Sequence, residues 1–108
     1  MTEITRFHNT VTITASSTAA TTSPRFAFTH MAGAGVLIGD TSGATQIDWY
    51  ASHGQNDTPL VVYADGSAVT TAVTVGAHPV PDACFAFPFV VPVVTGNTTC
   101  AMTVCLKG

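Results

Sequence analysis

The chain has 108 residues, of which 46% are hydrophobic and 8% are charged, and its formal net charge at pH 7 is −3. This length suits one domain and is too short for two independent cores. Only Arg6, Arg25 and Lys107 carry a fixed positive charge. These are too few for the phosphate contacts that nucleic-acid binding requires, so we expect no nucleic-acid partner.

The hydrophobic residues are not gathered into a membrane-spanning or targeting segment. No run approaches the roughly 18 apolar residues of a membrane-spanning helix, so we expect no membrane partner. The first residues lack the basic start and apolar core of a signal peptide. We therefore predict that the protein is synthesised in the cytoplasm.

Residues branched at the β-carbon dominate the composition. Thr, Val and Ile together supply 36 residues, whereas Leu, Met, Glu, Gln, Lys and Arg together supply 12. Side chains branched at the β-carbon lose rotamer freedom on a helix and pack well on a pleated strand. This imbalance predicts an all-β protein.

Short stretches with alternating polar and apolar residues recur along the chain and are separated by turn-forming residues, as in antiparallel strands. The pattern predicts a single antiparallel β-sandwich or jelly-roll-like barrel of about eight strands over residues 10–108. Residues 1–9 form an N-terminal arm or, equally well, a frayed terminus. In chain order, the strands are expected at 10–15, 25–31, 36–38, 46–52, 60–64, 67–75, 85–94 and 98–107.

Three local features add detail to this pattern. The alternation over 46–52 places Trp49 on the face that also carries Ile47 and Ala51, so Trp49 is expected inside the core. Asp65-Gly66 between two apolar runs favours a two-residue hairpin turn of type I′. Two prolines exclude a regular strand over 77–82, and Pro81 can begin a single helical turn.

No motif for nucleophilic catalysis, cofactor binding or metal binding stands out. Ser52 and His53 are adjacent in a loop, without the strained, glycine-flanked turn that usually presents a nucleophile. The histidines and cysteines lack the spacing of known metal sites. We therefore expect no enzymatic activity, no cofactor and no metal. The four histidines, at 8, 30, 53 and 78, are scattered.

The three cysteines, Cys84, Cys100 and Cys105, are an odd number, which does not suit a secreted disulfide framework. Cys100 and Cys105 are five residues apart on one expected strand, so they point to opposite faces and cannot pair there. We treat all three as small hydrophobic thiols.

Charged residues make up 8% of the chain, against about a quarter in an ordinary soluble domain. A subunit that hides much of its surface against neighbours needs fewer charges than a monomer. The alternative is a soluble monomer coated with Thr and Ser hydroxyl groups.

Segment 85–94 is apolar on both faces of the extended chain, unlike an outer strand of a monomeric sandwich. One interpretation buries one face in the core and the other against a second subunit, with Pro88 and Pro92 marking an edge strand. The other interpretation wraps the segment inside the core of the monomer. The first predicts a homo-oligomer, a dimer or a trimer, whose candidate interface is Phe85, Phe87, Phe89, Val91 and Val93.

As a whole, the pattern resembles the small β-sandwich cement or decoration proteins of tailed-bacteriophage heads. The resemblance covers most of the chain from about Gly35 onward and lies in five segments rather than in one diagnostic motif. These are Gly-Val-Leu-Ile, Ile-Asp-Trp-Tyr-Ala-Ser, Ala-Asp-Gly-Ser-Ala-Val, Pro-Val-Pro-Asp-Ala-Cys-Phe and Met-Thr-Val-Cys-Leu-Lys-Gly.

The resemblance implies a structural virion protein without an active site, made in the host cytoplasm and placed on the capsid surface. Its partners would be the major capsid protein or other virion proteins, and its role would be to stabilise the capsid lattice. Ile4, Arg6 and Phe7 are the candidate contacts of the N-terminal arm. The alternative function is a tail, fibre or cell-surface module that recognises a glycan or receptor through loops such as 53–58.

Overall fold

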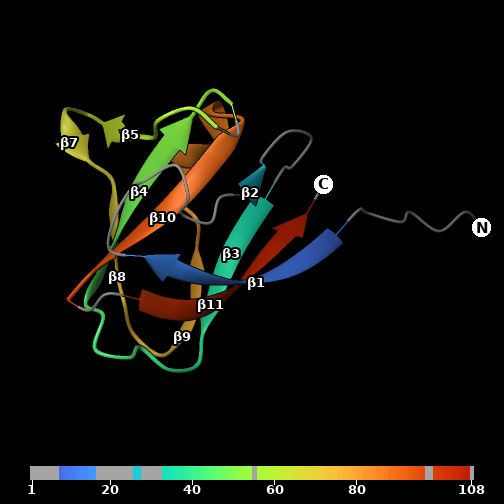
Figure 1. Cartoon of the computed structure of the whole chain (residues 1–108), viewed down its shortest axis with the longest axis vertical. Helices are drawn as coiled ribbons and strands as arrows, with labels where there is room; N and C mark the ends of the chain where they lie inside the picture. Colours follow the sequence, from blue (N-terminus) through green and yellow to red (C-terminus); the bar gives the residue numbers. More distant parts are fainter. Residues whose placement is uncertain (1–7, 17–25, 28–32, 55, 97–98, 108) are drawn as a thin grey trace, which may run out of the picture.

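Nearly all regular structure in the computed structural model is strand (Figure 1), and residues 8–16, 26–27, 33–54, 56–96 and 99–107 are described. This confirms the predicted all-β class. The elements are β1 (His8–Ser16), β2 (Phe26–Ala27), β3 (Gly33–Ile38), β4 (Gln46–Ser52), β5 (Leu60–Val61), β6 (Tyr63–Ala64), β7 (Ser67–Ala68), β8 (Thr70–Ala72), β9 (Gly76–Pro79), the short 3₁₀ helix η1 (Asp82–Ala86), β10 (Phe89–Thr95) and β11 (Thr99–Lys107).

The strands form two antiparallel layers that are joined at one point. Hydrogen bonding runs in the order β5-β4-β10-β1-β11-β3-β9, with β2 also paired to β10 and β8 to β4. The link between β10 and β1 is a single parallel bridge, Ser16 with Val93. The pair β4–β10 crosses the pair β1–β11 at this point (Figure 1), which gives the predicted sandwich.

The core lies between the two layers and follows the predicted alternation. Trp49 is fully buried, as expected from its position in 46–52, and its indole N–H donates to Thr71 Oγ1 at 2.9 Å. Buried aromatic N–H groups need such a partner. The other large core residues come from both layers and include Ile47, Val90 and Val94 on one side and Val36, Cys100, Met102, Val104 and Leu106 on the other.

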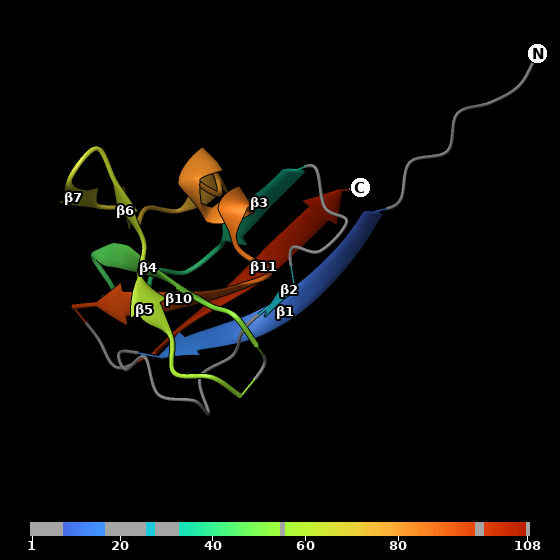
Figure 2. The same ribbon diagram turned by 90° about the horizontal axis from the view of Figure 1, so that it is seen from above.

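Asp65-Gly66 makes the predicted hairpin turn, because both residues have positive φ, 53° and 81°. The strands of this hairpin, β6 and β7, are shorter than expected and pair only with each other. Residues 63–68 are all exposed, and the hairpin projects from the body of the molecule (Figure 2).

The strand expected over 67–75 is interrupted where the chain rejoins the sheet. Val69 N–H donates to Val62 O, and Val62 N–H donates to Trp49 O, each at 2.9 Å. These two bonds hold the base of the β6–β7 hairpin against β4. On either side of the base, β5 and β8 pair one after the other along the same edge of β4. β5 and β8 thus together act as one edge strand beside β4, and the β6–β7 hairpin is a loop that leaves the sheet between them.

The first strand begins earlier than predicted, at His8 rather than at residue 10. It pairs with β11 over its whole length, from His8 with Lys107 to Ser16 with Thr99. The last two residues of the expected arm therefore belong to the sheet. The arm candidates Ile4, Arg6 and Phe7 lie outside the described residues.

Candidate docking site

A pocket of about 530 Å³ opens where β4 turns into β5, opposite the chain between η1 and β10. It brings together Phe87 of the predicted interface and His53, Asp57 and Thr58 of the predicted recognition loop. Its lining is mostly apolar and consists of Ala51, Ser52, His53, Asp57, Thr58, Leu60, Val61, Val62, Ala86, Phe87 and Pro88.

One wall comes from the turn between β4 and β5. The Ser52 hydroxyl donates to Gly54 O at 2.9 Å, and Asp57 N–H donates to the same carbonyl oxygen at 3.3 Å. The chain then returns through buried Pro59 and pairs antiparallel with β4, Leu60 opposite Ala51. This return places Leu60 on the rim, where 73% of it is exposed.

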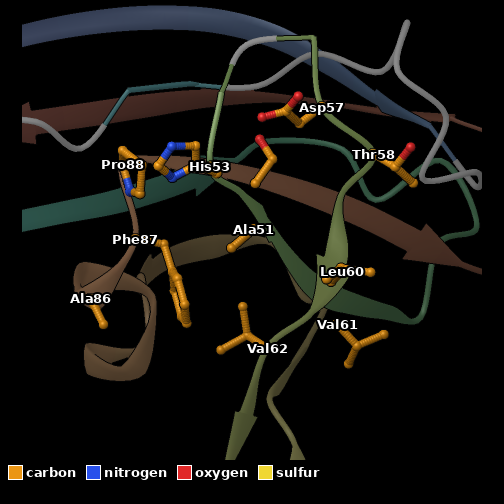
Figure 3. Close-up of a pocket in the computed structure, with 11 residues that line it drawn as sticks. Ala51, His53, Asp57, Thr58, Leu60, Val61, Val62, Ala86, Phe87 and Pro88 are labelled. Atoms are coloured by element: carbon orange, nitrogen blue, oxygen red, sulfur yellow. The ribbon is translucent and has the colours of Figure 1, made fainter.

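The other wall comes from η1 and the residues that follow it. Cys84 N–H donates to Pro81 O at 3.0 Å, and Phe87 N–H donates to Cys84 O at 3.3 Å. Phe87 itself is extended, with φ −120° and ψ 146°, so the helix ends there. Its side chain stays 39% exposed, and Figure 3 shows it facing the pocket across from Leu60.

The helical turn corrects the strand that was predicted over 85–94. Phe85 lies in η1, Phe87 follows it, and β10 begins only at Phe89. Pro81 supplies a helix-compatible start, and the turn sends Cys84 into the core with no exposed surface. The regular spacing of the phenylalanines therefore does not reflect one strand.

The five candidate interface residues differ in how deeply the structure buries them. Val91 and Val93 are buried within the chain, which favours the core interpretation for these two. Phe85 and Phe89 are half-buried, and Phe85 packs against the core. Phe87 is the member that presents a substantial apolar surface to solvent.

The expected edge position of this segment is only partly realised. Strand β10 pairs with β4 along its full length, from Phe89 with Ser52 to Thr95 with Gln46. On its other side it pairs with β2 at two residues and with β1 at Val93. Pro92 lies between these two short pairings, where the missing N–H removes no described ladder bond.

Sequence reasoning did not assign Leu60, Val61 and Val62 to a site. Their apolar run predicts a strand and nothing more, because periodicity does not indicate what contacts the outer side of an edge strand. One feature of the sequence could have indicated an edge strand here. Pro59 stands directly before the run, and proline in sheets is largely confined to edge strands and strand starts. Leu60 and Val61 form β5, which is the outermost strand of its layer.

The chemistry of the pocket is that of binding through apolar contact. Apolar side chains line most of it, while His53, Asp57 and Thr58 are exposed polar residues. Across the described ranges, no group of three His, Cys, Asp or Glu residues is placed to hold a metal ion. In the same part of the chain, no helix is long and apolar enough to cross a membrane.

The buried thiols behave as hydrophobic groups. All three cysteines are free, and Cys100 is buried while Cys105 is half-buried on the opposite face, as predicted. Burial raises the pKa of Cys84 to about 12. Burial, with a contribution from Asp40, also raises the pKa of Cys100.

We expect Cys84 and Cys100 to resist alkylation at pH 8 while the protein is folded, because the reactive thiolate is disfavoured and both side chains are inaccessible. Thiol titration should then detect no more than one reactive equivalent per chain, and all three after unfolding in denaturant. A reducing agent should leave the melting temperature unchanged. Reaction of two or more thiols in the folded protein would contradict this arrangement.

Comparison with known proteins gives one structural likeness. No protein-family model matches the chain, and no curated protein matches it. Among solved structures, it is similar to the crystal structure of the SPBc2 prophage-derived protein YomS, with a TM-score of 0.57 over 99% of this chain and 100% of that one. The two sequences are 12% identical. The likeness establishes the fold.

Because the alignment spans both chains, YomS shares the arrangement of strands and not merely a local motif. At this level of identity, the likeness does not extend to individual site residues. The pocket described above therefore rests on the geometry of this chain alone.

Proposed function

We propose that the chain is a structural component of a bacteriophage particle, without enzymatic activity, which binds the major capsid lattice and stabilises it. The observation that carries this proposal is the likeness in fold, over the full length of both chains, to a prophage-derived protein. Fold alone does not define function, so surface features must identify how the protein would dock.

The pocket supplies a docking feature that suits a protein partner. Phe87 and Leu60 present apolar surface beside a concave, mainly apolar lining. Interfaces gain most of their affinity from a few buried aromatic and aliphatic anchors that are surrounded by a polar rim. We infer that an apolar side chain of the major capsid protein enters the pocket and that Phe87 contacts it.

The polar residues of the pocket support a second candidate function, the recognition of a glycan or receptor. His53, Asp57 and Thr58 lie in the loop that the sequence offered for glycan or receptor recognition, and they line the same pocket as the Phe87 ring. Sugar binding combines an aromatic face with nearby hydrogen-bonding groups. Here Phe87 is the one Phe, Tyr or Trp residue among the lining residues, which makes a protein partner the better match.

The proposal predicts that the protein is present in phage particles purified from the strain that encodes it, and that recombinant protein rebinds particles lacking it. Phe87→Ala should weaken this binding by about 10- to 30-fold, because it removes a central aromatic anchor. Binding can be measured by co-sedimentation with particles, and mass spectrometry of the particles tests its presence.

Val75→Ala is the matched control, since Val75 is 67% exposed and lies outside the pocket. It should bind particles like the wild type. Thermal unfolding of Phe87→Ala should show a stability close to that of the wild type, because the ring is partly exposed. Absence from particles together with binding to a glycan array would reject the capsid role in favour of the recognition module.

A further inference from the structure

The layer opposite the pocket has an outer face with two rows of uncharged residues. We call the outer face the solvent side of β1, β11, β3 and β9, four strands that pair side by side. The strand registers align its residues in two rows that cross all four strands. The rows are Thr12, Thr103, Leu37 and Ala77, and Thr10, Cys105, Gly35 and Pro79.

The two rows are exposed or half-exposed and carry no charge. Lys107 lies in the adjoining row, at the end of β11. Asp40 borders the face, where it lines a hollow with Thr12 and Thr103. The chain has a net charge of −3, and its remaining aspartates lie on other elements, namely Asp48 on β4, Asp57 before β5, Asp65 in the hairpin turn and Asp82 in η1.

The outer face combines a projection with a hollow. Leu37 is 47% exposed. A hollow of about 290 Å³ adjoins it and is lined by Leu37 itself and by Gly35, Val36, Ala77, His78, Pro79 and Cys105. A second hollow adjoins it over Gly33 and Gly35. At Gly33 nothing lies within 4 Å of the position that a Cβ atom would take, whereas at Gly35 that position is 3.3 Å from His78 O. The open space over Gly33 lets a side chain from another molecule approach the backbone there.

A projection next to a hollow is a feature that two identical surfaces can share about a twofold axis. In an isologous interface, the projection of each subunit meets the hollow of the other. The rows contain threonine hydroxyls, which both donate and accept hydrogen bonds and can therefore pair with an identical surface. Uncharged rows also keep the negative charges of two copies away from the contact, whereas like charges placed opposite each other would oppose it.

We propose that two copies of the chain pack through their outer faces, with Leu37 of each copy seated in the hollow beside Gly35 of the other. Two sheets that pack face to face in this way lie about 10 Å apart. The outer face shares no residue with the docking pocket. The dimer and the capsid role are therefore independent proposals.

The test uses sedimentation velocity of the full chain over a series of protein concentrations. The wild type should sediment as a dimer, and Leu37→Glu should raise the dimer dissociation constant at least about 100-fold, because the contact would bury two unpaired carboxylates. Tyr63→Glu places a carboxylate in the same way at a residue that is 66% exposed, lies in the hairpin off the outer face and lines no part of the docking pocket. It should dimerise like the wild type.

A second measurement needs no variant. Cys105 lies in the contact, while Cys84 and Cys100 are buried in the core. Alkylation of Cys105 by iodoacetamide should slow markedly as the protein concentration rises through the dimer dissociation constant. It should be independent of concentration in Leu37→Glu.

Each of the following results would overturn the proposal. A wild type that stays monomeric at the highest soluble concentration excludes a dimer. A dimer that survives in Leu37→Glu places the contact elsewhere. So does a Cys105 alkylation rate that stays the same while sedimentation shows the wild type passing from monomer to dimer. A monomeric wild type whose Leu37→Glu variant loses binding to phage particles would assign the outer face to a different protein.

Discussion

Replacement of Trp49 by alanine is expected to lower the free energy of unfolding by about 3–5 kcal/mol. Trp49 has no exposed surface and belongs to the core cluster to which both layers contribute, so its removal leaves a large cavity. Small domains have a total stability of about 5–15 kcal/mol, and the variant should therefore be marginally folded. Chemical denaturation followed by circular dichroism measures the change.

Two milder substitutions separate the contribution of the buried ring from that of its hydrogen bond. Trp49→Phe retains much of the apolar volume but loses the hydrogen bond from the indole to Thr71 Oγ1, and Thr71→Val removes the acceptor while keeping the shape of the side chain. Each should cost less than Trp49→Ala. If Trp49→Ala were as stable as the wild type, the inward register of β4 would be wrong.

Replacement of Gly96 by alanine is expected to destabilise the protein by about 2–5 kcal/mol, the sum of a left-handed backbone cost and an overpacking cost. Gly96 has φ +98°, and a Cβ atom there would lie 2.9 Å from Gly43 O, Thr45 N and Thr45 Oγ1. Two of these atoms belong to the backbone. Thr45 N–H also donates to Thr95 O at 2.7 Å, so the clash would disturb this bond.

Two other glycines provide matched controls for Gly96→Ala. Gly66 has φ +81° but open space around its Cα, so Gly66→Ala should show only the backbone cost, about 1–2 kcal/mol. Gly39 has neither a left-handed φ nor a neighbour within 4 Å, and Gly39→Ala should leave the stability unchanged or slightly raised. Equal costs at Gly96 and Gly66 would contradict the close approach to Thr45.

The sequence predicted some residues of the docking pocket but not that they lie together. Sequence reasoning selected Phe87 and the 53–58 loop, but assigned them to two different functions. They line one pocket because β5 returns along β4 and η1 delivers Phe87 to the same end of the molecule. Contacts between residues some thirty positions apart depend on packing, which local pattern does not encode.

The error over 85–94 has a similar cause. Phenylalanine at every second position imitates a strand, yet the segment begins as a 3₁₀ turn. Burial of Cys84 and the backbone bond from Cys84 N–H to Pro81 O stabilise that turn. Tertiary burial thus overrode the local alternation.

Local sequence patterns were enough to predict the all-β class, the inward face of Trp49, the type I′ turn at Asp65-Gly66 and the opposed faces of Cys100 and Cys105. Each of these depends on side-chain branching, strand alternation or turn geometry within a few neighbouring residues. The order of the strands, the pocket and the two uncharged rows of the outer face could not be predicted and became evident from the fold. Those features depend on the register between strands distant in the chain, which is set by how their inward side chains pack together.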